Sequence, residues 1–379
     1  MIYLTYGNQS DGVYNSYVID ICNYMNETFN INIKIIAFIS LRNFFKIKTK
    51  RQKLYSNSII LPIFPKVILW KLNIITLIIV WLFAGRKKVI ALSPIAANLA
   101  LMLREIGFVK HVIYDGEGAT SAEWNEYNVV ENSLMKKQIY SIEKNAVINS
   151  DFRRAVSLKM VDYWKKKFAY VENKHVVIPC TLNGIFNNKY KEINYTLREQ
   201  YGYAKDDIVF VYAGSSAGWQ SFSIIDKYLL HVLGKNTHAK LLILSDLNIN
   251  VLKIHKKYPA RIKKMWVEYS DVPKYMRMCD YGILIREQSI TNRVAAPTKF
   301  AEYLSCGLKV LISKDIGDYT EFVEEHQCGV VIKNFETNIS LTSVDFKGKQ
   351  RINALALDKF NNNYFYNQFE KLVQFEVKA

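Results

Sequence analysis

Cysteine is sparse in this chain and is not arranged for chemistry. The five cysteines are scattered, with no pair at metal-ligand spacing and no even set that would form a disulfide framework. This usage predicts reduced thiols in a cytoplasmic protein. The cysteines are Cys22, Cys180, Cys279, Cys306 and Cys328.

The sequence also lacks the signatures of several enzyme classes. Its six histidines are spread along the chain, and no Ser/His/Asp order typical of hydrolases stands out. No cluster of metal ligands is visible, so neither a metal nor a bound cofactor is expected. The first residues, 1–7, read as a β-strand entering a loop and not as a secretory signal.

Negative charge is scarce relative to positive charge. The chain has 51 Lys and Arg against 34 Asp and Glu, a formal net charge of +17. Such an excess favours nucleic acid, anionic lipid or an anionic substrate as a partner. Because no recognised nucleic-acid motif appears, an anionic membrane surface is the favoured partner and nucleic acid is not expected.

One long apolar run bears on the membrane question. Residues Val67–Ala84 approach the length of about 20 residues that a transmembrane helix needs, but Lys71 and Asn73 interrupt the run. Three basic residues, 86–88, follow it, and the next residues read as a strand. We expect a helix buried against a sheet, with one face able to dip into a bilayer. A true membrane span is the alternative.

The length and the pattern of apolar segments predict two α/β domains. At 379 residues the chain suits two domains of ordinary size. Apolar strands alternate with helices of ten or more residues, which indicates parallel, doubly wound sheets. We place the first domain at residues 1–180 and the second at 181–360, separated by Pro179–Asn188, which is rich in Pro, Gly and Asn.

The expected elements are as follows. The strands of the first domain are 2–6, 31–39, 59–63, 89–92, 111–114, 146–149 and 175–178, and its helices are 15–26, 67–84, 95–106, 132–144 and 152–166. The strands of the second domain are 208–213, 240–244, 265–267, 281–285, 310–313 and 329–332, and its helices are 221–233, 248–258, 272–278, 297–306 and 320–325. A last helix is expected near 361–376.

The most informative segment runs from Ala296 to Ile312. Pro297 suits the first turn of a helix, and Gly307 suits the residue just past its end. Lys299 and Glu302 are three residues apart, so they share one helix face. A cation beside the free N–H groups of a helix N-terminus favours phosphate, and a carboxylate one turn further can accept hydrogen bonds from the hydroxyls of a ribose. This pair predicts a nucleoside diphosphate site; an ordinary exposed ion pair is the alternative.

The string from Arg286 through Glu302 to Gly307 resembles the donor-nucleotide segment of bacterial GT-B glycosyltransferases of the retaining family 4 type. The resemblance implies two Rossmann-like, doubly wound domains that face a central cleft. It also implies that 179–188 is the hinge, that the helix near 361–379 packs on the first domain, and that the donor is a nucleoside diphosphate sugar. The metal-binding Asp-X-Asp of other transferases is missing, so a metal-independent enzyme is expected.

The donor site implied by this resemblance draws mainly on the second domain. A Gly-rich loop between a strand and a helix contains Gly214, Ser215, Ser216 and Trp219. Its backbone N–H groups can approach phosphate oxygens; the alternative is that the loop is a simple tight turn without a ligand. The Arg and Lys that the family often carries there are absent, so Arg286, Arg293 and Lys299 are the substitutes, unless they are surface charges. The full predicted donor set is Gly12, Gly214, Ser215, Ser216, Trp219, Arg286, Arg293, Pro297, Thr298, Lys299 and Glu302.

The predicted catalytic residues are Arg286 and Lys299, which would stabilise the leaving diphosphate, and Asp115 and Glu117, one of which would orient or deprotonate the acceptor. Asp115 and Glu117 follow a predicted strand, and loop capping with solvent exposure is their alternative role. Glu302 matches the second of the family's two spaced glutamates. The first falls at Val294, and Glu287 is a possible substitute.

The sequence therefore predicts a retaining glycosyltransferase. Its acceptor would be a glycan, favoured to be lipid-linked, in capsule, O-antigen or related surface polysaccharide synthesis. The enzyme would be cytoplasmic and peripheral at the inner face of the cell membrane. Two alternatives stay open: a nucleotide-sugar 2-epimerase of the same fold, and a non-catalytic protein that binds glycan or nucleic acid.

Overall fold

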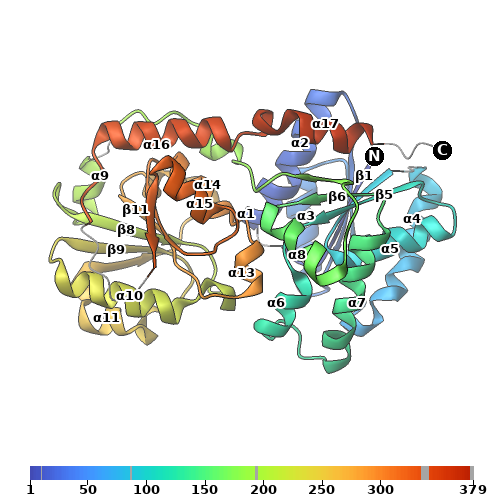
Figure 1. Ribbon diagram of the computed structural model, residues 1–379, viewed down its shortest axis with the longest axis horizontal. Coiled ribbons are helices and arrows are strands. Elements are labelled where there is room, and N and C mark those ends of the chain that lie inside the picture. The colour runs from blue at the N-terminus through green and yellow to red at the C-terminus, as the bar shows by residue number, and fades with distance from the viewer. Residues whose placement is uncertain (10, 86–87, 193–194, 334–340, 376–379) are drawn as a thin grey trace. The chain divides into compact units, whose positions relative to one another are not determined.

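The chain divides into two compact units, each built on its own parallel sheet (Figure 1). A computed structural model describes residues 1–9, 11–85, 88–192, 195–333 and 341–375. Unit 1 is Met1–Pro179 with Phe365–Ala379, and unit 2 is Cys180–Tyr364. The sequence analysis placed the divisions after residue 180 and after residue 360.

Unit 1 contains a seven-stranded sheet in the order β3-β2-β1-β4-β5-β6-β7, with every neighbouring pair parallel. The order reverses between β1 and β4, which is the switch point of this sheet. Apolar side chains fill both faces because helices cover both. The strands are β1 Ile2–Tyr6, β2 Lys34–Ile39, β3 Ser58–Pro62, β4 Lys88–Leu92, β5 His111–Gly116, β6 Phe152–Ala155 and β7 His175–Val177.

The helices of unit 1 connect successive strands, and the last helix of the chain, α17, packs against α2 through Phe369 and Tyr24, whose ring centroids are 5.1 Å apart. These helices are α1 Asp11–Val13, the π-helical η1 Tyr14–Ile19, α2 Asp20–Phe29, α3 Phe44–Leu54, the 3-10 helix η2 Val67–Leu72, α4 Asn73–Ala84, α5 Pro94–Glu105, α6 Thr120–Glu126, α7 Ser133–Asn149, α8 Leu158–Phe168 and α17 Tyr366–Gln374.

Unit 2 contains a six-stranded sheet in the order β10-β9-β8-β11-β12-β13, again parallel throughout. From β8 the chain moves outward to β9 and β10, and then it returns to the other side of β8 with β11. The switch point therefore lies between β8 and β11. The strands are β8 Ile208–Ala213, β9 Ala239–Leu244, β10 Ile262–Met265, β11 Tyr281–Leu284, β12 Lys309–Ser313 and β13 Gly329–Ile332.

Helices also connect the strands of unit 2, and α16 packs against α14. The α-helices are α9 Tyr195–Gln200, α10 Phe222–Lys235, α11 Lys253–Lys257, α12 Val272–Met276, α13 Ile290–Val294, α14 Thr298–Ser305, α15 Tyr319–His326 and α16 Phe346–Lys359. The 3-10 helices are η3 Gly184–Phe186, η4 Gly218–Gln220, η5 Ile249–Val251, η6 Pro259–Arg261, η7 Tyr269–Asp271 and η8 Asn362–Phe365. The predicted class, two doubly wound α/β domains, is confirmed.

Two adjacent predictions in unit 1 were wrong. The expected strand at 146–149 is the end of α7, and the expected helix at 152–166 begins instead as strand β6. The β6 segment contains Arg153 and Arg154, and both side chains are buried. Each guanidinium has acceptors inside the unit: Arg153 donates to the carbonyls of Val147 and Ile148, and Arg154 donates to the carboxylate of Asp115.

The apolar run 67–84 forms the 3-10 helix η2 followed by the α-helix α4. It is therefore not one continuous α-helix. One face is buried, with Trp70, Leu77 and Trp81 against the unit and Asn73 hydrogen-bonded to the carbonyl of Trp70 and the hydroxyl of Tyr6. Of the basic residues after the run, Arg86 and Lys87 lie outside the described residues. Among the described residues, no helix combines enough length with enough apolar character to cross a membrane.

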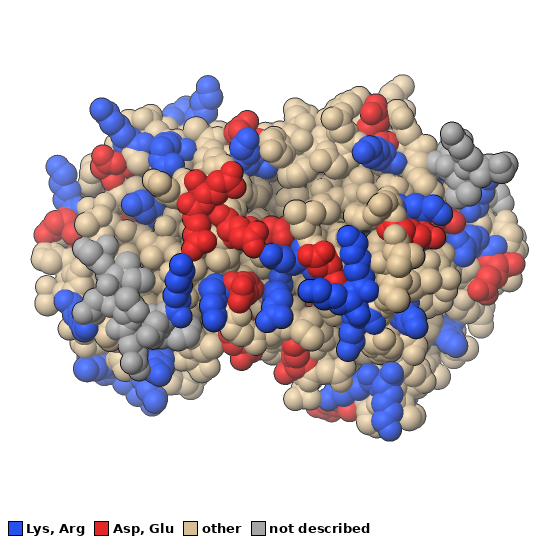
Figure 2. All heavy atoms as spheres, viewed as in Figure 1, with Lys and Arg blue, Asp and Glu red and all other residues tan. Residues whose placement is uncertain are grey.

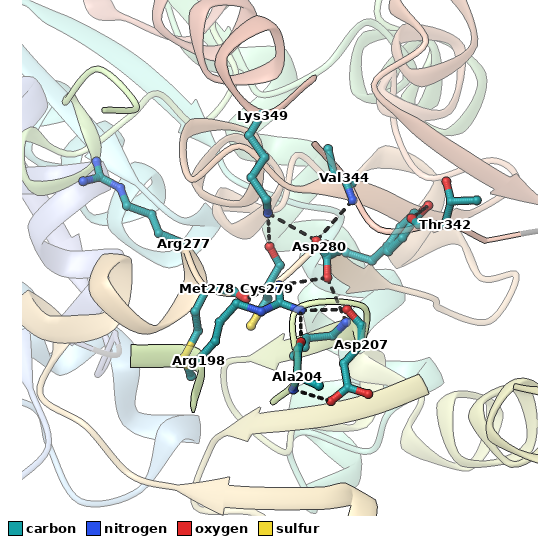
Figure 3. A network of polar contacts seen from close by, with 12 residues as sticks. Arg198, Ala204, Asp207, Arg277, Met278, Cys279, Asp280, Thr342, Val344 and Lys349 are labelled. Atoms are coloured by element: carbon teal, nitrogen blue, oxygen red, sulfur yellow. Dashed lines mark hydrogen bonds and ion pairs between the residues drawn. The ribbon is translucent and has the colours of Figure 1, made fainter. Parts of the chain in front are cut away.

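A buried carboxylate, that of Asp280, lies at the end of the unit 2 sheet where the central strands β8 and β11 begin (Figure 3). Asp280, 1% exposed, precedes β11 and accepts hydrogen bonds from the backbone N–H groups of Val209 and Val344, at 2.9 Å and 3.2 Å. Arg198 from α9 and Lys349 from α16 form ion pairs with it, at 3.3 Å and 3.6 Å. These contacts hold α9 and α16 to the start of the two central strands.

Replacing Lys349 with Met should strongly destabilise the fold. The substitution leaves the Asp280 charge buried with one cation fewer, and breaking a buried pair in this way costs about 3–5 kcal/mol. We expect the free energy of unfolding in urea to fall by this amount. A loss below about 1 kcal/mol would contradict the structural role assigned to the pair.

Candidate active site

The candidate site of unit 2 lies at the switch point, where the loops after β8 and β11 meet. Ligands of doubly wound folds sit beyond the carboxyl ends of the strands at such a point. The loop after β8 covers residues 214–221, and the loop after β11 covers 285–289. The hydroxyl of Ser221 in the first loop accepts a hydrogen bond of 2.9 Å from the N–H of Glu287 in the second. The two loops therefore form one structure.

Helix α14 is fastened to the switch point by Tyr303. The hydroxyl of Tyr303 accepts from the N–H of Ala213 at 3.1 Å and donates to the carbonyl of Ile283 at 3.4 Å, so it joins the ends of β8 and β11. Its ring lies directly over Gly282, where an added Cβ would stand only 2.2 Å from the ring. This contact fixes which side chains of α14 point at the two loops.

The ends of α14 agree with the sequence. Pro297 is the N-cap and the helix starts at Thr298, one residue later than predicted. The helix ends at Ser305 with Cys306 as its C-cap, and Gly307 follows with φ of 76°, a left-handed conformation that glycine adopts without steric cost. Its predicted place just past the helix end is confirmed.

Two buried cations meet at one neutral oxygen. Lys299 Nζ from α14 donates to Gln220 Oε1 at 2.9 Å, and Arg286 Nη2 donates to the same oxygen at 3.2 Å. Arg286 also donates to Asn292 Oδ1 at 3.2 Å. The exposed fractions are 7% for Lys299 and 6% for Arg286. Neither is a surface charge, so that alternative reading is wrong for both.

The ammonium of Lys299 is poorly compensated. It lies 4.3 Å from the ring centroid of Tyr212, and within the described part of the chain it forms no ion pair with a carboxylate. Burial lowers the pKa of Lys299 well below its ordinary value, and the nearby charge of Arg286 lowers it further. A bound anion would relieve both effects because it would bring negative charge to two desolvated cations.

Gly214 lies immediately beside this ammonium. Its φ is 136°, and an added Cβ would stand 3.0 Å from Lys299 Nζ. A side chain at this position would therefore crowd the cation from the exposed side of the loop. The absence of a Cβ lets the backbone of the loop lie close to Lys299.

Glu302 follows one turn along α14 and is half-buried. It forms no ordinary exposed ion pair with Lys299. Its Oε1 accepts a hydrogen bond of 3.0 Å from the hydroxyl of Tyr269, which follows β10. Burial raises the pKa of Glu302 to about 7, although Tyr269 and Lys299 oppose this shift. The carboxyl group therefore changes its charge near neutral pH.

The remaining predicted donor residues of unit 2 differ in how far they are exposed. Ser215 and Ser216 are exposed in the loop after β8, and the Ser215 carbonyl accepts a 2.6 Å hydrogen bond from Tyr212. Trp219, Pro297 and Thr298 are half-buried. Arg293 is exposed on α13 and takes no part in the contacts that join Arg286, Lys299 and Gln220. Val294 is buried, and the backbone of Glu287 helps to join the loops.

Sequence reasoning missed the neutral groups of the site. Gln220 and Asn292 supply the oxygens that hold the cations, Tyr212 lies beneath Lys299, and Tyr303 fastens the helix. Uncharged amides and tyrosines carry no motif by themselves. The one signal that could have found them is their position in the chain, because each lies on or beside an element that ends at the switch point.

Asp115 of unit 1 does not occupy a catalytic position. It lies within β5, is 0% exposed, and pairs at 3.0 Å with Arg154, its neighbour in the register of β6. The hydroxyls of Tyr3 and Tyr17 also donate to it, at 2.5 Å and 2.8 Å. The predicted contact with an acceptor and the alternative of loop capping are both wrong, because Arg154, Tyr3 and Tyr17 occupy the carboxylate oxygens in the interior.

The other two predicted residues of unit 1 lie near ends of strands. Glu117 directly follows β5 and its side chain is exposed, so it stays a candidate to contact an acceptor. Gly12 lies in α1, where its carbonyl accepts a hydrogen bond from Ser16. Among the described residues, no group of three His, Cys, Asp or Glu side chains gathers as a metal site.

Comparison with solved structures identifies the architecture. The chain aligns with the Anabaena protein Alr3699/HepE in complex with UDP at a TM-score of 0.70 and 14% identity, covering 98% of this chain and 99% of that one. A glycosyltransferase from Rickettsia africae aligns at a TM-score of 0.69 and 14% identity, covering 99% of each chain. The fold is GT-B.

A third GT-B neighbour is WaaG, a glycosyltransferase involved in lipopolysaccharide biosynthesis, at a TM-score of 0.59 and 11% identity, covering 99% of this chain and 96% of that one. HepE was also solved with UDP-glucose. No protein-family model matches the chain, and no curated protein matches it by sequence. The GT-B fold thus rests on three-dimensional likeness over almost the whole chain.

Replacing Lys299 with Met should leave the fold intact or stabilise it. The substitution removes a desolvated charge that contacts two neutral groups, the amide of Gln220 and the ring of Tyr212. Exchanging buried charge for apolar volume is often neutral or stabilising by about 1–4 kcal/mol. We expect no decrease in the free energy of unfolding. The matched control is Lys349→Met, a buried lysine paired with a carboxylate. Equal destabilisation by the two substitutions would contradict this reading.

Proposed function

We propose that this protein is a glycosyltransferase that uses a nucleoside diphosphate sugar as donor. The observation that carries the proposal is the pair of buried cations, Arg286 and Lys299, that share the neutral oxygen of Gln220 at the switch point of unit 2. Two desolvated cations that share one neutral amide oxygen suit a ligand with two neighbouring phosphates. The GT-B neighbours that bind UDP and UDP-glucose support this choice of donor.

The reaction requires stabilisation of the diphosphate as it leaves the anomeric carbon. Arg286 and Lys299 would meet the negative charge that grows on the phosphate oxygens, and the N-terminus of α14 would add its N–H groups. Because Gln220 and Asn292 already orient the cations, little reorganisation is needed when the bond breaks. Glu302 would accept hydrogen bonds from the ribose hydroxyls one turn further along the helix.

The finer features of the reaction are proposals that rest on the sequence resemblance. We propose that the anomeric configuration is retained and that no metal takes part, since the two cations are assigned to the phosphate charge. Glu117 is the remaining candidate among the predicted carboxylates to contact the acceptor. Gly12 and the loop before it are proposed to lie near the donor.

We further propose a glycan acceptor attached to lipid, in the synthesis of a surface polysaccharide such as capsule or O-antigen. Likeness to WaaG supports this class of pathway. A lipid-linked acceptor would place the enzyme at the inner face of the cell membrane, where the net charge of +17 would favour anionic lipid. Nucleic acid is not a proposed partner.

The proposal is tested by incubating the purified protein with a panel of nucleotide sugars, with and without a lipid extract that contains glycan acceptors. A transferase releases nucleoside diphosphate quickly only when acceptor is present. Conversion of the free donor to another sugar nucleotide would indicate the 2-epimerase, and binding without turnover would indicate a non-catalytic protein. Activity should persist in a chelator; loss that manganese or magnesium restores would contradict metal independence.

Glu302 should make donor binding depend on pH. Only the carboxylate form accepts both ribose hydroxyls, so affinity for UDP-glucose should fall as the pH drops through about 7, the pKa of this residue, by at most about tenfold per pH unit. Glu302→Gln should weaken binding by about ten- to a hundredfold at pH 8, since a hydrogen bond to a charged group contributes about 1.5–3 kcal/mol. The variant should also lose this pH dependence.

Titration calorimetry with UDP-glucose measures both effects, because the phosphates of this donor do not titrate in the same range as Glu302. Glu325→Gln, which neutralises an exposed carboxylate on α15, is the matched control and should bind like the unaltered protein. Retention of the full pH dependence by the folded Glu302→Gln protein would exclude Glu302 as its source.

A further inference from the structure

Helix α4 presents an apolar face to solvent. Its buried face already packs on unit 1, yet its outer face is apolar as well. We call this outer face the α4 stripe; its five side chains are 41% to 89% exposed, with Phe83 the most exposed of them. The α4 stripe consists of Leu72, Ile75, Ile79, Leu82 and Phe83.

The stripe is unlike the outer face of an ordinary surface helix. Such a helix places charged residues toward water, but α4 contains no charged residue between Asn73 and Ala84. Helix α8 of the same unit, in contrast, ends in three lysines. A contiguous set of large exposed apolar side chains marks an interaction surface.

The sequence segment that contains the stripe carries charge of one sign. Between Glu27 and Glu105 the sequence contains no Asp or Glu, whereas it contains 13 Lys and Arg. On the face of the molecule shown in Figure 2 basic and acidic side chains are interspersed, so this segment differs from the general surface. Exposed lysines precede the stripe at Lys66 and Lys71 of η2, and others lie on α3, which precedes the edge strand β3.

We propose that the α4 stripe docks into the surface of an anionic lipid bilayer. Apolar side chains enter the acyl boundary without needing a shaped partner, while basic side chains beside them remain at the level of anionic headgroups. A second copy of this chain fits less well, because it would bring the same basic segment against itself. The inference rests on the proposed membrane location, but it is independent of the donor chemistry in unit 2.

The test uses the full chain and vesicles of phosphatidylcholine, alone or mixed with phosphatidylglycerol, in a co-sedimentation assay. The unaltered protein should bind the mixed vesicles at low salt, bind the neutral vesicles weakly, and be partly released by high salt. Leu82→Ser combined with Phe83→Ser should weaken binding to the mixed vesicles by about tenfold or more. Lys66→Gln with Lys71→Gln should reduce the preference for the anionic lipid.

The matched control is Leu158→Ser with Val171→Ser, which removes two exposed apolar side chains of unit 1 outside the stripe and should leave vesicle binding unchanged. Equal binding by the stripe variant and the unaltered protein would overturn the proposal. So would a dimer, seen by light scattering, that the stripe variant disperses while no vesicle binding occurs.

A separate measurement distinguishes this proposal from the proposed function. Affinity for UDP-glucose without vesicles should be the same in the stripe variant and the unaltered protein, because the stripe lies outside the donor site. Donor binding without any vesicle binding would overturn the docking proposal alone. Vesicle binding without donor binding would overturn the proposed donor alone.

Discussion

The buried carboxylate of Asp280 is the contact on which unit 2 depends. It accepts from the backbone N–H of Val209, and its own N–H donates to the carbonyl of Val209 at 2.7 Å, so it holds the start of β11 against the start of β8. Arg198 and Lys349 supply the positive charge that makes its burial tolerable. The same two strands diverge at their other ends, where Tyr303 joins them and the candidate site begins. The cluster around Asp280 thus fixes the spacing of β8 and β11 at the end of the sheet opposite to the candidate site.

The two buried lysines of unit 2 show how structure and function place different demands on one residue type. Lys349 faces Asp280 and completes an ion pair, whereas Lys299 faces an amide oxygen and an aromatic ring. Only the second arrangement leaves positive charge available to a ligand. A protein that carries such a poorly compensated cation loses stability in the empty state and gains affinity for an anion. The nearby Glu302, with a pKa raised to about 7, adds a second group whose charge is poised near neutral pH.

Unit 1 buries an ion pair in its interior and exposes apolar side chains on its surface. Its buried Asp115 and Arg154 neutralise one another between β5 and β6, and Tyr3 and Tyr17 take up the remaining oxygen positions. A carboxylate that looked reactive in the sequence is therefore a structural one. Outward, the unit exposes apolar side chains on α4 within a segment that has no acidic residue. The interior of unit 1 thus contains Asp115, which the sequence suggested for chemistry, and its surface contains the apolar face of α4, which the sequence analysis expected to be able to enter a bilayer.

Local patterns in the sequence determined much of this protein. The alternation of strands and helices, the cap at Gly307 and the i, i+3 spacing of Lys299 and Glu302 depend on short-range geometry, which a chain segment carries with it. Tertiary structure decided what those residues face. Arg153 and Arg154 lie in a strand and are buried, because the end of the preceding helix supplies acceptors for Arg153 and Asp115 of the neighbouring strand supplies one for Arg154. Tertiary structure also brought Gln220 to Arg286 and Lys299 across 66 and 79 residues of sequence. Such contacts follow from the strand order, and strand order is a property of the whole chain.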